Sequence, residues 1–453
     1  MFKRSRQPLA GAVLVLSCLF VALALSASQE ATPIPYSQFE GSDACASCHT
    51  VIASQHNQSL MSKCFTHPWD EIEYFELALP HSGLNEKVAE VKSGCMGCHA
   101  PTAFLAGDIP PARPKTGGPA NDSVSCDFCH SITGFRGDVP YNFNYLLAPG
   151  EAVQGVRSDS ESPVHPVTVN PFLRTAELCG ICHNEKDPYG VWVKSTHLEW
   201  KQGPYAAAGI VCQDCHLPPA PGSSAPGMGK ERPDIRQHLF HGAHDSGKLA
   251  GAVEVRLFAE TDKVRSGDEL VVTATLVNAK AGHMIPSGSA EERLLWLHVE
   301  VRDAGGKTYH LPVDKKGFEG EQWTIADPAA LAYQDLGEIK QIADFRGLPR
   351  DGDVPAGDRI FRLPYLDPEG RMTIAQWHTA ALGPDYRLAP LKAVNETLRW
   401  RIPEDVSPGP ADLTATVWYS KLVPSVGRFL GVPESELEAV RVNKASIQVE
   451  VTR

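Results

Sequence analysis

The sequence contains five copies of the pattern Cys-x-x-Cys-His, which start at positions 45, 95, 126, 179 and 212. This spacing is how proteins attach a c-type haem covalently. Two thiols can bond the porphyrin vinyl groups, and the histidine that follows can bind the iron from the proximal face. The predicted attachment residues are Cys45, Cys48, His49, Cys95, Cys98, His99, Cys126, Cys129, His130, Cys179, Cys182, His183, Cys212, Cys215 and His216. We therefore expect five covalently bound haem c groups as cofactors.

A single Cys-x-x-Cys pair also fits a zinc site or a structural disulfide. Zinc ribbons use two such pairs per metal ion and need no trailing histidine. Here every pair carries the histidine and the number of pairs is odd. The repetition therefore favours haem attachment over zinc.

The first residues have the pattern of an export signal. Three basic residues within the first six positions precede an apolar run at 9–25 and small residues at 26–28. We predict a signal peptide at 1–28, a periplasmic or extracellular protein, and no transmembrane span in the mature chain. An uncleaved membrane anchor is the alternative, although the run is shorter than a spanning helix usually needs. A lipid on Cys18 is less favoured, because the apolar run continues beyond it.

Composition places the chain among globular proteins of two or three domains, with 42% hydrophobic and 21% charged residues. The formal net charge is −12, and removal of the three basic residues of the signal would take it to −15. Such a charge argues against nucleic acid as a partner. After cleavage only Cys64 remains outside the motifs, so no internal disulfide can form without a motif cysteine.

The motifs follow one another at intervals of 50, 31, 53 and 33 residues. This rhythm predicts a single leading haem and two duplicated two-haem modules, with coincidence as the alternative. We assign residues 29–250 to a pentahaem cytochrome c domain. Residues 101–171 are rich in Pro, Gly, Asn, Asp and Ser and should form loops. Short helices are expected at 45–61, 175–183 and 197–205.

After His244 the pattern changes, because cysteines are absent and apolar residues alternate with polar ones. Strands are predicted at 253–257, 270–277, 295–301, 413–419 and 447–451. Turns separate several of them, which favours an antiparallel, immunoglobulin-like β-sandwich at 251–453. We expect insertions at 315–371 and a short helix at 433–436. The predicted fold class is mixed: a loop-rich, short-helix domain packed around five c-type haems, followed by this sandwich.

The second axial ligand of each haem decides between electron carrier and open, reactive iron. Twelve histidines lie outside the motifs, so a full set of second ligands is available. We predict ligands at His165, His197, His238, His244 and His283, in addition to the motif histidines. For the crowded loop at 238–244 the alternative is exposure to solvent. His197 could instead pack against a ring edge, and His283 could lie in an ordinary turn between strands.

The chain resembles secreted bacterial multihaem c-type cytochromes related to the hydroxylamine oxidoreductase superfamily. The resemblance covers most of the mature protein and rests on the stretches 45–65, 95–101, 126–130, 212–218 and 282–288. It implies bis-histidine ligation, closely stacked haems, a C-terminal sandwich and respiratory electron transfer outside the cytoplasm.

One expected ligand of that family is missing. The helix after the first motif often carries Ser-Met-His there, whereas this chain has Ser59-Leu60-Met61. Methionine can bind haem iron and raises its potential relative to a second histidine, so Met61 is a candidate ligand. His56 or His67 could replace it, or that haem could be open.

These features predict an electron carrier between redox partner proteins, such as a membrane-linked donor or other cytochromes. An oxidoreductase that acts on a small nitrogen or sulfur compound at one open haem is the alternative. All five motifs are regular, and no catalytic residue is predicted. The C-terminal part could also dock partners or support a homo-oligomer or filament, in which His283 or the 238–244 loop would ligate iron of a neighbouring chain.

Overall fold

The computed structural model describes most of the chain, namely residues 32–150, 152–314, 323–327, 330–350 and 352–453. From Ile34 to Arg453 these residues form one compact unit. The predicted export signal and Cys18 lie outside the described residues. Among the helices that the structure describes, none has both the length and the apolar character needed to cross a bilayer.

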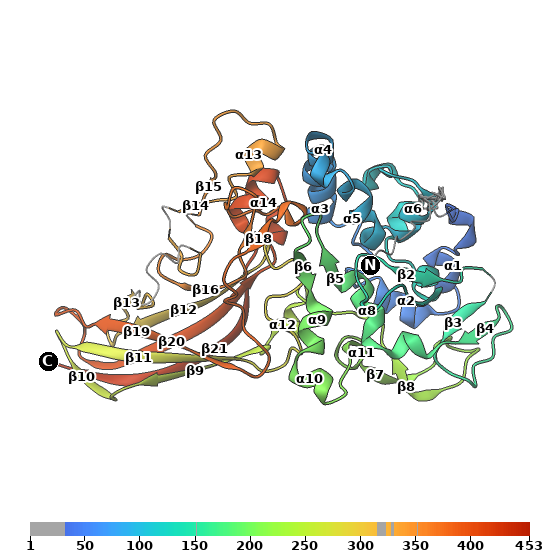
Figure 1. Ribbon diagram of the computed structural model, residues 1–453. Coiled ribbons are helices and arrows are strands. Elements are labelled where there is room, and N and C mark those ends of the chain that lie inside the picture. Colours follow the sequence, from blue (N-terminus) through green and yellow to red (C-terminus); the bar gives the residue numbers. More distant parts are fainter. Residues whose placement is uncertain (1–31, 151, 315–322, 328–329, 351) are drawn as a thin grey trace, which may run out of the picture. The chain divides into compact units, whose positions relative to one another are not determined.

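Short helices joined by irregular segments build the part of the chain that carries the five motifs (Figure 1). The helices are α1 (Ser42–Ala46), α2 (Thr50–His56), α3 (Pro68–Ile72), α4 (Leu79–Leu84), α5 (Val91–His99), α6 (Pro101–Ala106), α7 (Cys126–Cys129), α8 (Ala176–His183), α9 (Thr196–Lys201), α10 (Pro204–Ala207), α11 (Cys212–His216) and α12 (Ser246–Leu249). Turns of 3-10 helix lie at Tyr36–Gln38, Glu86–Val88, Pro114–Thr116, Pro119–Asp122 and Pro171–Arg174. The helix predicted at 175–183 is present as α8, whereas the ranges 45–61 and 197–205 are each divided between two shorter helices.

Residues 101–171 contain more regular structure than the loops that the composition predicts. Helices α6 and α7 lie here, together with four strands of three or four residues. The strands of the motif-bearing part are β1 (Ile132–Phe135), β2 (Tyr145–Leu147), β3 (Val153–Gly155), β4 (Val167–Val169), β5 (Asn184–Lys186), β6 (Trp192–Ser195), β7 (Pro219–Gly222) and β8 (Arg232–Arg236). These strands form two-stranded sheets, and the hydrogen bonds of each sheet hold the long connections between motifs in place.

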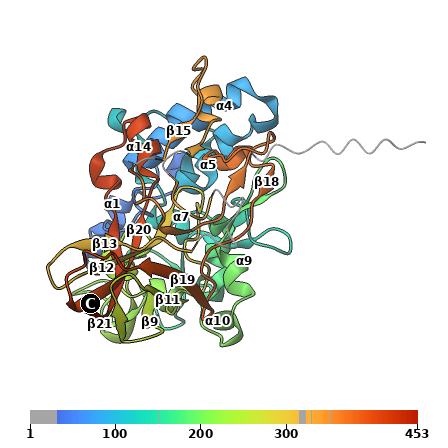
Figure 2. The same cartoon turned by 90° about the vertical axis from the view of Figure 1, so that its left-hand side faces the viewer.

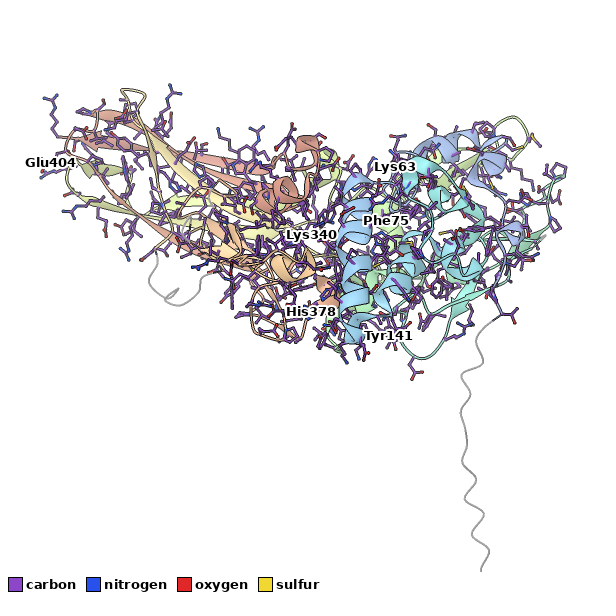
Figure 3. All side chains as sticks on the ribbon, turned by 90° about the horizontal axis from the view of Figure 1, so that it is seen from above. Lys63, Phe75, Tyr141, Lys340, His378 and Glu404 are labelled. Atoms are coloured by element: carbon purple, nitrogen blue, oxygen red, sulfur yellow. The ribbon has the colours of Figure 1, made fainter. Side chains whose placement is uncertain are left out.

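A longer helical run precedes the second motif. It begins at Pro68, whose fixed φ suits the first position of a helix. It continues through a π-helical segment, Glu73–Ala78, into α4. Figure 3 shows Lys340 and His378 beside the helix that carries Phe75. The Lys340 ammonium lies 3.2 Å from the Glu76 carboxylate, so this run contacts the C-terminal part of the chain.

Two β-sheets with a common hydrophobic core form the C-terminal part (Figure 1, Figure 2). One has the order β19–β11–β9, and the other has the order β10–β21–β20–β12–β13, with β16 also on β12. The strands are β9 (Val253–Ala259), β10 (Lys263–Arg265), β11 (Glu269–Asn278), β12 (Leu294–Arg302), β13 (Thr308–His310), β14 (Leu331–Ala332), β15 (Leu348–Pro349), β16 (Arg359–Phe361), β17 (Tyr365–Leu366), β18 (Ala381–Leu382), β19 (Ala393–Arg401), β20 (Gly409–Ser420) and β21 (Val440–Thr452). Helices α13 (Leu336–Ile339) and α14 (Pro424–Leu430) and 3-10 turns at Gln376–His378 and Glu434–Glu436 complete it.

The long strands follow the alternation that the sequence predicts. Along β11, buried residues at even positions alternate with partly exposed ones, and the buried set faces the core between the sheets. Pairing is antiparallel, except that β10 lies parallel to β21. This pair departs from the fully antiparallel arrangement that we predicted.

The two parts of the chain share a second hydrophobic cluster. Phe65 and Leu77, from the motif-bearing part, belong to the same cluster as Trp296, Ile360 and Trp377. A hydrogen bond crosses the same region, because the Trp377 indole Nε1 donates to His81 Nδ1 at 3.0 Å. The two parts of the chain therefore share a common core.

Candidate haem-binding site

Helical geometry arranges the motif side chains. Helix α5 contains the whole second motif, so Cys95, Cys98 and His99 occupy positions i, i+3 and i+4. These positions lie on one face of a helix. Helices α8 and α11 contain the fourth and fifth motifs in the same way. The second, fourth and fifth motifs thus each present two thiols and an imidazole toward one side.

Backbone carbonyls orient four of the five motif histidines. In each case Nδ1 donates to a carbonyl oxygen, which leaves Nε2 as the free ligand atom. The pairs are His49 with Ser224 (2.8 Å), His99 with Cys64 (2.8 Å), His130 with Gln154 (2.7 Å) and His216 with His241 (2.7 Å). Residues at least 24 positions away along the chain supply all four carbonyls, so the tertiary fold fixes the tautomer that iron ligation requires.

Two predicted second ligands lie near motif histidines. The ring centres of His49 and His165 are 6.4 Å apart, and those of His130 and His238 are 6.3 Å apart. Imidazoles on opposite sides of one metal ion have ring centres roughly 6 Å apart, given metal–nitrogen bonds of about 2.0 Å. Both spacings therefore fit an iron held between two histidines.

Packing prepares His238 for this position. Its Nδ1 donates to the Arg236 carbonyl at 2.9 Å, and its backbone N–H donates to Gln55 of α2. Burial, with a contribution from nearby His130, lowers the pKa of His238 to about 4. The imidazole is therefore neutral at pH 7, as an iron ligand must be.

His283 and His197 lie near the fourth motif. Burial lowers the pKa of both His183 and His216 to about 4, and nearby His283 contributes to both shifts. His283 Nδ1 donates to the Met284 carbonyl, so its Nε2 is free for a ligand. His197 is buried against Gly180, and its Nε2 has no hydrogen-bond partner among the described residues. His283 thus lies close enough to His183 and His216 to influence the charge of both.

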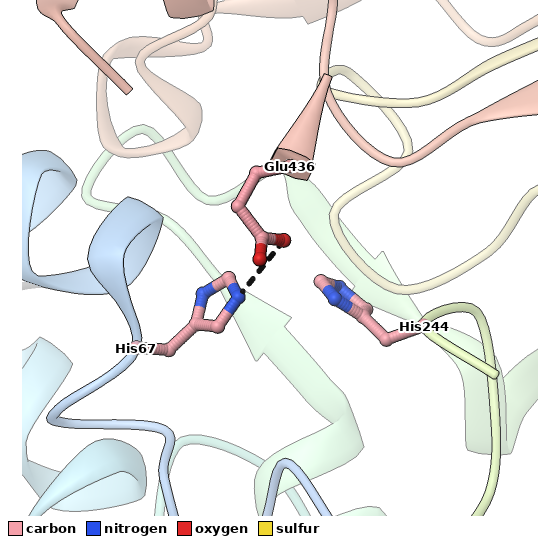
Figure 4. A group of neighbouring side chains, drawn as sticks. All are labelled: His67, His244 and Glu436. Atoms are coloured by element: carbon pink, nitrogen blue, oxygen red, sulfur yellow. Dashed lines mark hydrogen bonds and ion pairs between the residues drawn. The ribbon is translucent and has the colours of Figure 1, made fainter. Parts of the chain in front are cut away.

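His244 has different neighbours. Figure 4 shows His67, His244 and Glu436 directed toward one another, and the rings of the two histidines are 5.3 Å apart at 84°. Lys421 forms an ion pair with Glu436 at 2.8 Å. Burial, followed by the charge of Arg293, lowers the pKa of His244 to about 2. His244 is therefore a neutral imidazole in a group that already contains cations.

Met61 lies in an apolar cluster with Phe128, Cys129 and Cys182. Its backbone carbonyl accepts a hydrogen bond from Val124. Met61 thus packs against the same apolar cluster as Cys129 of the third motif and Cys182 of the fourth, whereas the motif that precedes it in sequence is the first.

Ionisable residues that the sequence does not reveal lie around the second motif, and they are buried or partly buried. Asp70 lies 2.9 Å from His67 Nδ1 and 3.1 Å from His99 Nδ1. Burial alone would lower the pKa of His99, but the hydrogen bond and charge of Asp70 outweigh it and raise that pKa to about 9. Periodicity gives no sign of such residues, because charged side chains are normally exposed.

Glu73, Glu185 and Lys194 line a small cavity beside Cys95 and His99. Lys194 forms an ion pair with Glu185 at 2.7 Å. Burial, followed by the charge of Glu292, raises the pKa of Glu73 to about 8, so its carboxyl group is largely protonated at pH 7. The cavity therefore combines a buried cation with a group able to hold a proton.

Contacts between cysteines give the spatial order of the motifs. The thiol of Cys45 lies within hydrogen-bonding reach of Cys126, and helix α1 contacts α7. Cys179 is similarly close to Cys212, and Cys98 to Cys182. The third motif approaches the fourth through Cys129 and Cys179. The first motif therefore lies next to the third, the third next to the fourth, and the fourth next to the fifth. The second motif lies next to the fourth.

Comparison with known proteins identifies a shared fold. No protein-family model and no curated protein matches the chain. A solved structure of a penta-heme cytochrome c552 from Thermochromatium tepidum matches with a TM-score of 0.59 and 20% identity, and covers 92% of this chain and 100% of that one. The chain therefore has the fold of that penta-heme cytochrome.

Two other solved structures match much more weakly. The CARDB domain of the PF1109 protein from Pyrococcus furiosus, in complex with di-metal ions, has a TM-score of 0.18 at 11% identity, over 44% of this chain and 87% of that one. The N-terminal domain of the Streptococcus gordonii adhesin Sgo0707 has a TM-score of 0.19 at 12% identity, over 43% and 32%. At these scores neither structure bears on fold or function.

Proposed function

We propose that this protein is a pentahaem c-type cytochrome that carries electrons between redox partner proteins. The observation that carries the proposal is the pairing of His49 with His165 and of His130 with His238, at the spacing of two ligands on one iron. The fold of a penta-heme cytochrome c552 supports it. When bound, the haems supply iron centres that take up and release single electrons.

The residues of the chain position these cofactors and tune them. The motif cysteines hold each porphyrin by two covalent bonds, and the contacts between Cys45 and Cys126 and between Cys179 and Cys212 hold neighbouring attachment points side by side. The carbonyl bonds to Nδ1 orient the proximal imidazoles and make them stronger ligands. Differences in burial and in nearby charge, such as Asp70 beside His99, give the iron centres different potentials.

The proposal includes a location and partners. The protein acts in the periplasm or outside the cell after removal of residues 1–28, and it exchanges electrons with a membrane-linked donor or another cytochrome. It is a distant relative of the hydroxylamine oxidoreductase superfamily, and its C-terminal part is an immunoglobulin-like sandwich. This part docks a partner or a second copy of the chain. The acidic net charge favours a basic docking surface on the partner.

The test is the haem content and the coordination of the mature protein. Intact-mass analysis of protein made with a c-type maturation system should show five attached haems and a start near residue 29. The reduced absorption spectrum should not change on addition of carbon monoxide, because a carrier has two ligands on every iron. Fewer than five attached haems, or zinc in place of iron, would overturn the proposal.

A second candidate function is an oxidoreductase with an open haem at the second motif. The cluster of buried Glu73 with partly buried Glu185 and Lys194, beside Cys95 and His99, favours it, because ionisable groups in a cavity can deliver protons to a bound substrate. A carbon monoxide shift that involves one haem would support this candidate. Lys194→Met should then change the pH dependence of turnover, whereas Lys87→Met, a surface variant, should not.

A further inference from the structure

A group of metal-type side chains lies in the C-terminal part, on the outer face of the larger sheet. His298 Nδ1 is 2.9 Å from the Asp358 carboxylate, and His310 Nε2 is 2.6 Å from it. The imidazole rings stack with centres 4.9 Å apart and planes 15° apart. The three ligand atoms all lie within 4.8 Å of one another.

Strand register explains why these residues meet. On β12, Glu300 pairs with His310 of β13, and Leu297 pairs with Arg359 of β16. His298 lies two residues from Glu300 and so shares its face, whereas Val299 points into the core. Asp358, directly before β16, is brought opposite His298. The group thus forms beside β12, where the last residue of β13 and the residue before β16 both lie next to His298.

The carboxylate in this group is held rigidly. Asp358 is fully buried, whereas His298 and His310 keep 22% and 33% of their side-chain surface exposed. Gly357, directly before it, has φ +85°, and a Cβ there would lie 2.6 Å from Pro312 Cβ. The turn is therefore packed tightly against the segment after β13. A buried carboxylate flanked by two accessible imidazoles resembles the inner ligands of a site that is open on one side.

Charge distinguishes this group from the other cluster of similar composition. Glu436, which faces His67 and His244, already forms an ion pair with Lys421, and Arg293 lies near His244. Beside His298, in contrast, the next charged group is another carboxylate, Glu300, 3.9 Å from its Nε2. A cation is therefore favoured at Asp358 and disfavoured at Glu436.

We propose that His298, His310 and Asp358 bind a divalent transition-metal ion, for which Zn²⁺ is the probe. A tetrahedral zinc site has ligand atoms about 3.4 Å apart, given metal–ligand bonds of about 2.0–2.2 Å. Small rotations of the two rings reach this arrangement from the observed spacing. The ion would join β13 and the turn at 355–358 to β12, with its remaining positions open to water.

The test uses the full-length, haem-loaded protein after treatment with a chelator. Equilibrium dialysis against micromolar Zn²⁺, followed by mass spectrometry of the elements, should give one zinc for every five irons. His298→Gln and His310→Gln should each weaken binding at least about tenfold, because each removes one of three ligands. Lys307→Gln, in the same hairpin, is the matched control and should bind as the wild type does.

Thermal unfolding provides a second readout. Zinc should raise the unfolding midpoint of the wild type and of Lys307→Gln but not of the two histidine variants. The histidines are partly exposed, so both variants should keep the wild-type haem spectrum. Absence of zinc from the wild type, or equal zinc content in the wild type and both histidine variants, would overturn the proposal.

Discussion

At the scale of single residues, substitution of His238 is the most direct test of the proposed haem ligands. His238→Ala removes the imidazole whose ring centre lies 6.3 Å from that of His130, and under the proposed function this variant should leave one iron with an open position. About one fifth of the haem absorbance should then shift on addition of carbon monoxide to the reduced protein, since one haem of five is affected. His241→Ala, in the same loop, should leave the spectrum unchanged, because its backbone rather than its ring contacts His216. A shift of the same size in both variants would contradict the pairing.

Asp335 gives a prediction about pH. Burial is the main cause that raises the pKa of this carboxyl group to about 7, and its Oδ1 has no partner among the described residues. The folded state therefore keeps a proton that the unfolded chain releases near pH 4, so the free energy of unfolding falls as pH rises from about 4 to 7. Asp335→Asn removes the ionisable group that causes this fall in the free energy of unfolding. The variant should be more stable than wild type by about 1–3 kcal/mol at pH 8.

Thermal unfolding midpoints at pH 5 and pH 8 measure this effect. The difference between Asp335→Asn and wild type should grow with pH, whereas exposed Asp412→Asn should differ from wild type equally at both values. A constant difference for Asp335→Asn would show that the carboxyl group is ionised at both.

At the scale of elements, the glycines of the helices are not equivalent. In α5 a Cβ on Gly97 would lie 2.4 Å from the ring of Phe143, whereas a Cβ on Gly83 in α4 would meet nothing within 4 Å. Gly97→Ala should therefore cost about 1–3 kcal/mol through overpacking. Gly83→Ala should be neutral or stabilising by up to about 1 kcal/mol, because alanine favours the helix. Denaturant unfolding of variants with equal haem content compares the two, and equal effects would contradict this packing.

At the scale of the whole molecule, the shared hydrophobic cluster predicts that the C-terminal part depends on the rest of the chain. Residues 251–453 expressed alone would keep the core between the two sheets but expose Trp296, Ile360 and Trp377 to water. Exposed apolar surface of this kind favours association. The fragment should bind a hydrophobic dye and unfold well below the full chain. A sharp transition near that of the full chain would instead support an independent domain.

Much of this arrangement could be predicted because its causes are local. A motif of five residues brings its cysteines and histidine to one helical face, and alternation along a strand such as β11 marks the buried side. The helix at 175–183 and the five predicted strands are present for the same reason. Asp70 and Lys194 could not be predicted, since their burial depends on partners that come from other segments.

The amino-acid sequence thus specifies the number of haem attachment motifs, their chemistry and the change to β-structure after His244, all of which depend on neighbours within a few residues. Only the tertiary structure decides that His165 lies near His49, that His238 lies near His130, and that the second motif contacts the fourth through Cys98 and Cys182. These pairs join residues more than 80 positions apart. Their meeting depends on how loops and small ladders pack, and local patterns carry no information about such packing.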